Sequence, residues 1–151
     1  MKLSIRLVGL AVIAIAAVFN APRAVQARGD HGCSYRTVSG AFGYVITGTR
    51  LGIGPVASQG VLTFAEDGTV EGSQTASFNG TIATESYTGT YVVDESCSGS
   101  FTVVVTSSIP AFNRTSTVNL VWEDDARAAH AIFASPQTVL TADARRVFGH
   151  D

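Results

Sequence analysis

From residue 37 onward, hydrophobic and polar side chains alternate in short segments, which is the pattern of half-buried β-strands. No stretch of this region has the 3.6-residue repeat of an amphipathic helix. The clearest turn signals between segments are Asp67-Gly68 and Asn79-Gly80, both typical of type I′ hairpins. The pattern predicts eight strands, at residues 37–47, 61–65, 70–78, 81–93, 97–106, 117–123, 128–133 and 138–148, with a glycine-rich loop at 48–60.

Short connections between consecutive strands imply antiparallel neighbours, because parallel pairs need a long crossover. Eight such strands predict an all-β fold, an eight-stranded antiparallel up-and-down barrel. Closure also removes the exposed edges that a sheet rich in Val and Thr would otherwise present. A two-sheet β-sandwich is the alternative architecture. A barrel of this size either fills its interior with side chains or holds one small ligand.

The inner face of each strand is indicated by glycines that precede an aromatic residue by two positions, at 40–42, 89–91 and 99–101. Both residues of such a pair lie on the same face of a strand. If that face points inward, most inward positions are apolar, and they include Phe42, Tyr44, Ile46, Leu62, Phe64, Phe101, Val103, Val105, Val118, Leu120, Trp122, Ala129, Ala131 and Phe133.

Three strands add polar groups to this predicted interior: Gln74 at 70–78, Glu85 at 81–93, and Asp143 with Arg145 at 138–148. An apolar interior with a few polar side chains is typical of small-molecule sites. The predicted ligand-binding residues are Tyr44, Gln74, Glu85, Tyr87, Tyr91, Trp122, Asp143 and Arg145, and Glu85 is the candidate catalytic residue. In the alternative interpretation, a one-residue slip turns Glu85 to solvent, and Asp143 and Arg145 form an ion pair at the barrel end.

The N-terminal 27 residues have the features of a secretory signal peptide. Lys2 and Arg6 precede an apolar run at residues 7–19, and Val25-Gln26-Ala27 resembles a cleavage site. The run is shorter than the roughly 20 residues that cross a bilayer, although an uncleaved anchor is the alternative. We expect one barrel domain at residues 28–151 that is secreted or periplasmic after cleavage near Ala27, with no membrane span.

The two cysteines, Cys33 and Cys97, predict one disulfide in an exported chain. Two free thiols are the alternative. The formal net charge is −2, and loss of the signal peptide would remove three basic residues and no acid. Such an acidic protein is a poor match for nucleic acid. No phosphate-binding, dinucleotide-binding or hydrolase motif is present, and the histidines are too scattered for a metal site, so we expect no metal and no cofactor.

The chain resembles a group of small exported bacterial proteins of uncharacterised function. The shared motifs are Cys33-Ser34 and the segments 40–44, 66–69, 88–91 and 94–97. The chain is also distantly similar to calycin-type barrels, the lipocalins and allene-oxide-cyclase-like proteins. Lipocalins carry Gly-x-Trp on the first strand and an Arg on the last strand that packs over it. The matching positions here are Gly40 with Phe42, and Arg145 or Arg146, so the resemblance implies a barrel but no particular reaction.

Three functions fit these observations. The first is a secreted barrel that binds a small apolar or aromatic ligand in its interior. The second is a structural or interaction module of the cell envelope with a filled barrel. The third is an allene-oxide-cyclase-like isomerase or cyclase, in which Glu85, Tyr87 and Tyr91 steer a reactive intermediate. A ligand-sized cavity lined by Glu85 would favour the first or third, and a packed interior would favour the second.

Overall fold

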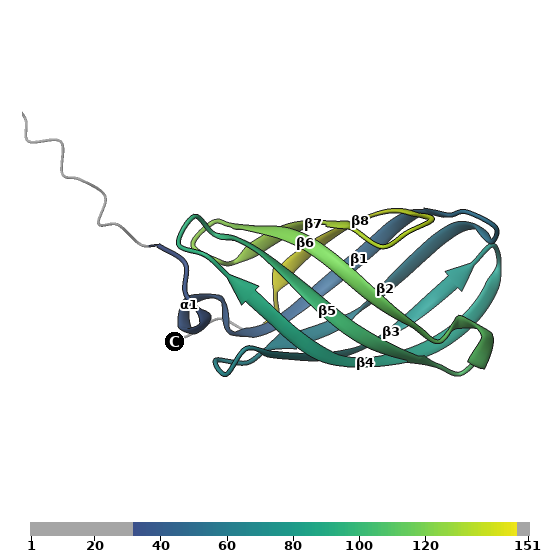
Figure 1. Cartoon of the computed structure of the whole chain (residues 1–151), viewed down its shortest axis with the longest axis horizontal. Coiled ribbons are helices and arrows are strands. Elements are labelled where there is room, and N and C mark those ends of the chain that lie inside the picture. Colours follow the sequence, from purple (N-terminus) through teal and green to yellow (C-terminus); the bar gives the residue numbers. More distant parts are fainter. Residues whose placement is uncertain (1–31, 148–151) are drawn as a thin grey trace, which may run out of the picture.

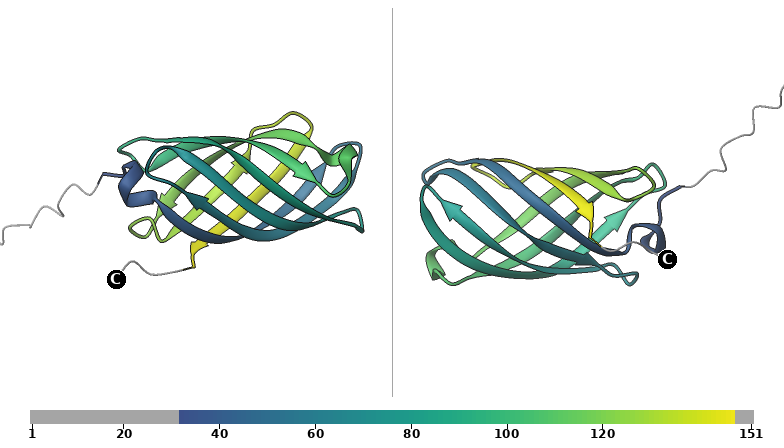
Figure 2. Two further views of the ribbon diagram at one scale, coloured as in Figure 1. Left: turned by 90° about the horizontal axis from the view of Figure 1, so that it is seen from below. Right: turned by 180° about the vertical axis from the view of Figure 1, so that it is seen from behind.

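The protein is a closed barrel of eight antiparallel strands, in which each strand pairs with its neighbours in the sequence and β1 pairs with β8 (Figure 1). Two further views show the same closed wall of tilted strands (Figure 2). The computed structural model describes residues 32–147, so the predicted signal peptide lies outside the described residues. The predicted up-and-down barrel is confirmed, and the alternative β-sandwich is wrong.

The strands differ mainly in length from those that the sequence predicts. They are β1 (Gly40–Arg50), β2 (Gly54–Phe64), β3 (Thr69–Phe78), β4 (Thr81–Val93), β5 (Ser98–Ser107), β6 (Arg114–Glu123), β7 (Ala128–Phe133) and β8 (Thr138–Arg146). Two short helices complete the fold, α1 (Tyr35–Val38) and the 3-10 helix η1 (Pro110–Phe112). Both helices are too short to span a membrane. No helix that could span a membrane is found among the described residues.

Three predicted boundaries are wrong. The expected loop at 48–60 is mostly strand, because Gly48 and Gly54 adopt positive φ and bend the chain without ending the ladder. The expected first strand does not begin at residue 37, since Ser34 and Thr37 form a capping box that starts α1. The sixth strand begins at Arg114 and not at residue 117.

Both predicted hairpins are present, but only one has the predicted turn. Asn79 and Gly80 both have positive φ, as a type I′ turn requires. In the other hairpin only Gly68 has positive φ, and its amide donates a hydrogen bond to the carbonyl of Ala65. Asp67 instead accepts hydrogen bonds from Thr69, so this connection is a longer loop that ends in a left-handed glycine.

The barrel end that carries α1 is sealed by aromatic packing. The ring of Phe64 lies 4.7 to 5.9 Å from four other aromatic rings, those of Phe42, Tyr91, Phe101 and Trp122. Val38 of α1 is fully buried against this core. Burial of large rings dominates the energetics of such a core, because each ring removes 150–250 Å² from water.

Two further contacts hold α1 in place. The Cys33–Cys97 disulfide ties the segment before α1 to the β4–β5 connection and confirms the predicted pairing. Arg146, at the end of β8, donates hydrogen bonds to the carbonyls of Ser39, Thr37 and Ala126. Its guanidinium carbon lies 4.9 Å from the centroid of the Phe42 ring. The N-terminal helix, the first strand and the last strand are therefore joined at one end.

The opposite end is covered by η1, the green helix at the right of Figure 1. The ring of Phe112 in η1 lies 4.4 Å from the ring of Phe78 in β3. Guanidinium groups of Arg50 and Arg114 also lie near the Phe78 ring, at 5.9 and 5.6 Å from its centroid. This end, which we call the η1 end, therefore combines aromatic and cationic side chains.

Candidate functional site

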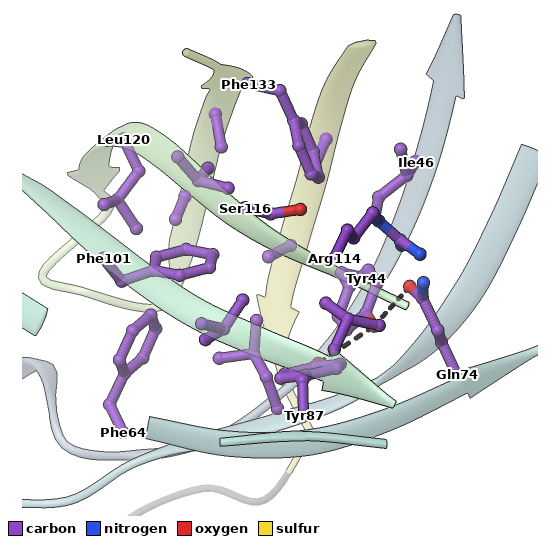
Figure 3. A pocket seen from close by; sticks show the side chains of 18 residues that line it. Tyr44, Ile46, Phe64, Gln74, Tyr87, Phe101, Arg114, Ser116, Leu120 and Phe133 are labelled. Carbon is purple, nitrogen blue, oxygen red and sulfur yellow. Dashed lines mark hydrogen bonds between the residues drawn. The ribbon is translucent and has the colours of Figure 1, made fainter. Parts of the chain in front are cut away.

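The interior of the barrel contains a cavity of about 60 Å³ between the aromatic cluster at the α1 end and a group of polar side chains nearer the η1 end (Figure 3). Its lining is almost entirely apolar, with Tyr44, Gln74, Tyr87, Arg114 and Ser116 as the polar members. Pockets for drug-sized ligands measure about 300–1,000 Å³. In this conformation the cavity has room only for a molecule of a few heavy atoms.

The cavity exists because one wall of the barrel carries very small side chains. Ala129 and Ala131 of β7 face inward beside Ala144 and Ala142 of β8, with which they pair in register. Bulky residues on the opposite strands, Leu62 and Val105 among them, do not reach far enough to fill the space in front of these methyl groups. We call these four residues the alanine wall.

A chain of hydrogen bonds crosses the interior next to the cavity. Tyr87 Oη donates to Tyr44 Oη at 2.9 Å, and Tyr44 Oη donates to Gln74 Oε1 at 2.8 Å. The Gln74 amide nitrogen then donates to Glu85 Oε2 at 2.5 Å. Ser58 adds a second donor to Gln74 Oε1. Each member of this chain therefore has a partner, as buried polar groups require.

Glu85 is buried and lies at the end of this chain, which excludes the slipped register for β4. Arg114 of β6 makes two hydrogen bonds to it, Nη1 to Oε1 at 2.6 Å and Nη2 to Oε2 at 2.8 Å. This bidentate pair neutralises a carboxylate whose side chain is fully shielded from solvent. Oε1 accepts from Arg114, and Oε2 accepts from both Arg114 and Gln74, so the hydrogen bonds of the carboxylate are made to protein groups.

Two glycines make room for the tyrosines. A Cβ atom on Gly60 of β2 would lie 2.8 Å from Tyr44 Oη, and one on Gly72 of β3 would collide with Tyr87 Oη. These paired strands therefore present bare backbone where the phenol groups lie against the barrel wall. The carbonyl oxygen of Val61 lies 3.4 Å from Tyr87 Oη at the same place and is an alternative acceptor for its single proton. Glycine is required here by close approach and not by a turn.

Burial changes the acid–base properties of the two tyrosines. The pKa of Tyr44 is raised to about 12, chiefly by loss of solvent; the hydrogen bond with Tyr87 opposes this rise, the charge of Glu85 adds to it, and Arg114 lowers it slightly. Burial also raises the pKa of Tyr87, with an additional contribution from Tyr44. Both phenols therefore stay protonated at neutral pH and act as hydrogen-bond donors.

These shifts predict alkaline sensitivity. Between the ordinary tyrosine pKa of about 10 and the folded-state pKa of about 12, the unfolded chain loses phenol protons that the folded protein keeps. The free energy of unfolding should therefore fall as pH rises through this window, by up to about 1.4 kcal/mol per pH unit for each tyrosine. Urea unfolding of Tyr44→Phe should show a shallower decline than the native protein. Equal slopes would contradict the assignment.

Of the predicted site residues, the structure brings together Tyr44, Gln74, Glu85 and Tyr87 in the hydrogen-bonded chain. Tyr91 and Trp122 are also buried, but they belong to the aromatic cluster at the α1 end and do not line the cavity. Glu85 does not line the cavity either, because Arg114 and Gln74 lie around its carboxylate.

The predicted inward direction of Asp143 and Arg145 is wrong. Both are exposed, and the inner face of β8 is formed by Leu140, Ala142 and Ala144. Asp143 lies on the outer surface, where its carboxylate is 2.6 Å from His130 Nδ1. The alternative prediction, an ion pair between Asp143 and Arg145, is also wrong, because these two residues form no ion pair in the described part of the chain.

Sequence reasoning missed Arg114 and half of the alanine wall. Extending the alternation of β6 by two positions upstream of Ser116 would have placed Arg114 on the inner face. The need of a buried carboxylate for a cation would then have joined it to Glu85. The alternation of Leu140, Ala142 and Ala144 with polar neighbours was likewise present in the sequence.

Within residues 32–147, no three His, Cys, Asp or Glu side chains converge as a metal site requires. Comparisons of the chain with models of known protein families, with curated proteins and with solved structures found no match. The function of the candidate site is therefore inferred from its geometry alone. The site is a small apolar cavity beside a chain of polar side chains that hydrogen-bond to one another.

Proposed function

We propose that the protein is an exported barrel that binds a small apolar or aromatic molecule in its interior cavity. The observation that carries the proposal is the alanine wall, which leaves about 60 Å³ unfilled in an otherwise packed apolar core. At about 24 cal/mol per Å³, such a void costs the fold on the order of 1.5 kcal/mol. An apolar occupant regains these lost contacts, and its size is limited to a single ring or a short chain.

The polar chain contributes orientation and not catalysis. Tyr44, Gln74 and Tyr87 reach the cavity surface, so a ligand with one polar atom meets hydrogen-bonding groups at a few defined points in an otherwise apolar lining. Glu85 is withdrawn behind them by Arg114. This arrangement supports binding over the isomerase hypothesis, which needs Glu85 to face the reacting molecule.

An exported location is part of the proposal. It is supported by the signal-like pattern of residues 1–27 and by the Cys33–Cys97 disulfide, since disulfides persist in oxidising compartments. The likeness to calycin-type barrels is supported by the packing of Arg146 over Phe42. Together these features fit a small carrier or sensor outside the cytoplasm.

Benzene, the smallest aromatic molecule, is the probe for the cavity, and the lining must move slightly to admit it, because a dry cavity that takes up benzene measures about 150 Å³. At about five times its dissociation constant it should stabilise the protein by about 1 kcal/mol, which corresponds to a rise in melting temperature of about 2–4 °C. Ala142→Leu fills the cavity from the alanine wall and should abolish this rise. Thr141→Leu places the same side chain on the exposed outer face of β8 and should preserve it. A benzene response that is absent, or equal in both variants, would contradict the proposal.

A filled structural module of the envelope is the second candidate. It is favoured by the cavity volume, which is about one fifth of the lower limit for ordinary ligand pockets. In that case Ala142→Leu should simply stabilise the protein, and no small apolar molecule should change the melting temperature. The benzene experiment therefore distinguishes the two functions.

A further inference from the structure

The two ends of the barrel differ in charge. The connections at the α1 end contain one basic residue, Arg127, and six acidic residues, Glu66, Asp67, Asp94, Glu95, Asp124 and Asp125. The connections at the η1 end, residues 51–53, 79–80, 108–113 and 134–137, contain no ionisable side chain. The charged groups of the η1 end are therefore those of the adjoining strands, Arg50, Arg114 and Glu85.

These three groups leave one positive charge unbalanced. Glu85 is bound by Arg114 in a bidentate pair, so its charge is already neutralised. Arg50, the last residue of β1, has no carboxylate partner among the described residues. The η1 end of an acidic protein is thus locally cationic, which attracts small anions.

Arg50 also has an unsatisfied hydrogen-bond donor. Its Nη1 atom is shielded from solvent and has no acceptor. A charged donor in this condition is costly, because it has lost its water without gaining a partner. Burial, and then the charge of Arg114, lowers the pKa of Arg50, although a guanidinium remains protonated at neutral pH. An anion would supply the missing acceptor.

The surroundings of Arg50 favour an anion with an apolar body. The Phe78 ring lies 5.9 Å from its guanidinium carbon and 4.4 Å from the ring of Phe112, and Ile53 and Ile109 pack against the core at the same end. A fully hydrated ion such as phosphate would have to lose its water against these side chains. Arg50 and Phe112 are only partly buried, so the end is reachable from solvent once the long Arg50 side chain swings outward.

We propose that the η1 end binds a small carboxylate with an apolar or aromatic body, in which the carboxylate pairs with Arg50 and the body lies against the partly exposed ring of Phe112. Arginine matches a carboxylate with two parallel hydrogen bonds, which gives both strength and orientation. This site is separate from the interior cavity, so it does not depend on the proposed function.

Calorimetric titration with benzoate and its neutral analogue benzamide tests the site. At low salt, benzoate should bind the native protein at least tenfold more tightly than benzamide, and added salt should weaken benzoate alone. Arg50→Gln should reduce benzoate affinity at least tenfold, whereas Arg50→Lys, which keeps the charge, should lose less. Arg36→Gln removes the same charge from exposed α1 at the opposite end and should change affinity less than twofold.

Three results would overturn the proposal: equal affinity for benzoate and benzamide, an equal loss in Arg36→Gln and Arg50→Gln, or inorganic phosphate binding as tightly as benzoate. Ala142→Leu should leave benzoate binding intact, because the interior cavity is not involved. Benzene binding without benzoate binding would refute this site alone. If benzoate binding requires Arg50 but benzene does not bind, only the interior cavity is refuted as a ligand site.

Discussion

Replacing Arg114 by Met should destabilise the protein by about 3–5 kcal/mol, because it leaves the carboxylate of Glu85 buried without its cation. The Glu85 side chain is fully shielded from solvent, and Gln74 would remain as its hydrogen-bond donor. Burying an unpaired charge costs more than the pair itself contributes. Urea unfolding at neutral pH measures the change.

A second variant separates the charge from the lost packing. In the double variant Glu85→Gln with Arg114→Met, no buried charge remains, so more than half of the lost stability should return. Arg36→Met, on the exposed face of α1, should change stability by less than about 0.5 kcal/mol. If Arg114→Met behaves like Arg36→Met, then the ion pair does not hold the interior together.

Removing the disulfide by Cys33→Ser with Cys97→Ser should cost about 4 kcal/mol. The two cysteines are separated by 64 positions, and the loop-closure entropy that the bridge removes from the unfolded chain grows with this length. The loss should also release α1, which holds the aromatic cluster closed through Val38 and Tyr35. Urea unfolding of the double variant measures the cost.

Reductant provides the control for this prediction. It should lower the stability of the native protein to that of the double Ser variant and leave the variant itself unchanged. A native protein that is equally stable with and without reductant would show that the bridge contributes nothing to the fold.

The barrel could be predicted from the sequence because hairpin signals and strand alternation are local properties. The Asn79-Gly80 pair favours a tight turn, and a tight turn sets the pairing of the two strands on either side of it. The alternation of Glu85, Tyr87 and Tyr91 on β4 likewise survives, since a strand with one buried face keeps its register. Strand boundaries were less accurate because glycines at positions 48 and 54 act as bends in a barrel and not as loop residues.

The inner face of β8 was missed, although Leu140, Ala142 and Ala144 alternate there with polar neighbours. Val139 and Val147 lie on the same face as Asp143 and Arg145 and favour it as the inner one, but both are exposed, because β-branched residues favour strands on either face. The true inner face carries alanines, whose hydrophobicity is weaker than that of the valines on the outer face. The partner of Glu85 was missed for a different reason: the predicted sixth strand begins at residue 117 and leaves Arg114 in a loop, whereas in the barrel Arg114 of β6 reaches Glu85 of β4 across the intervening β5.

The most direct test of the account is a crystal structure of the protein soaked with benzene or pressurised with xenon, since dry apolar cavities take up both. The account predicts density for the probe in front of the alanine wall, next to Ala131 and Ala142, with Glu85 still paired to Arg114. A cavity that stays empty at saturating probe, or side chains that have closed over it, would contradict ligand binding in the interior and leave a filled structural barrel.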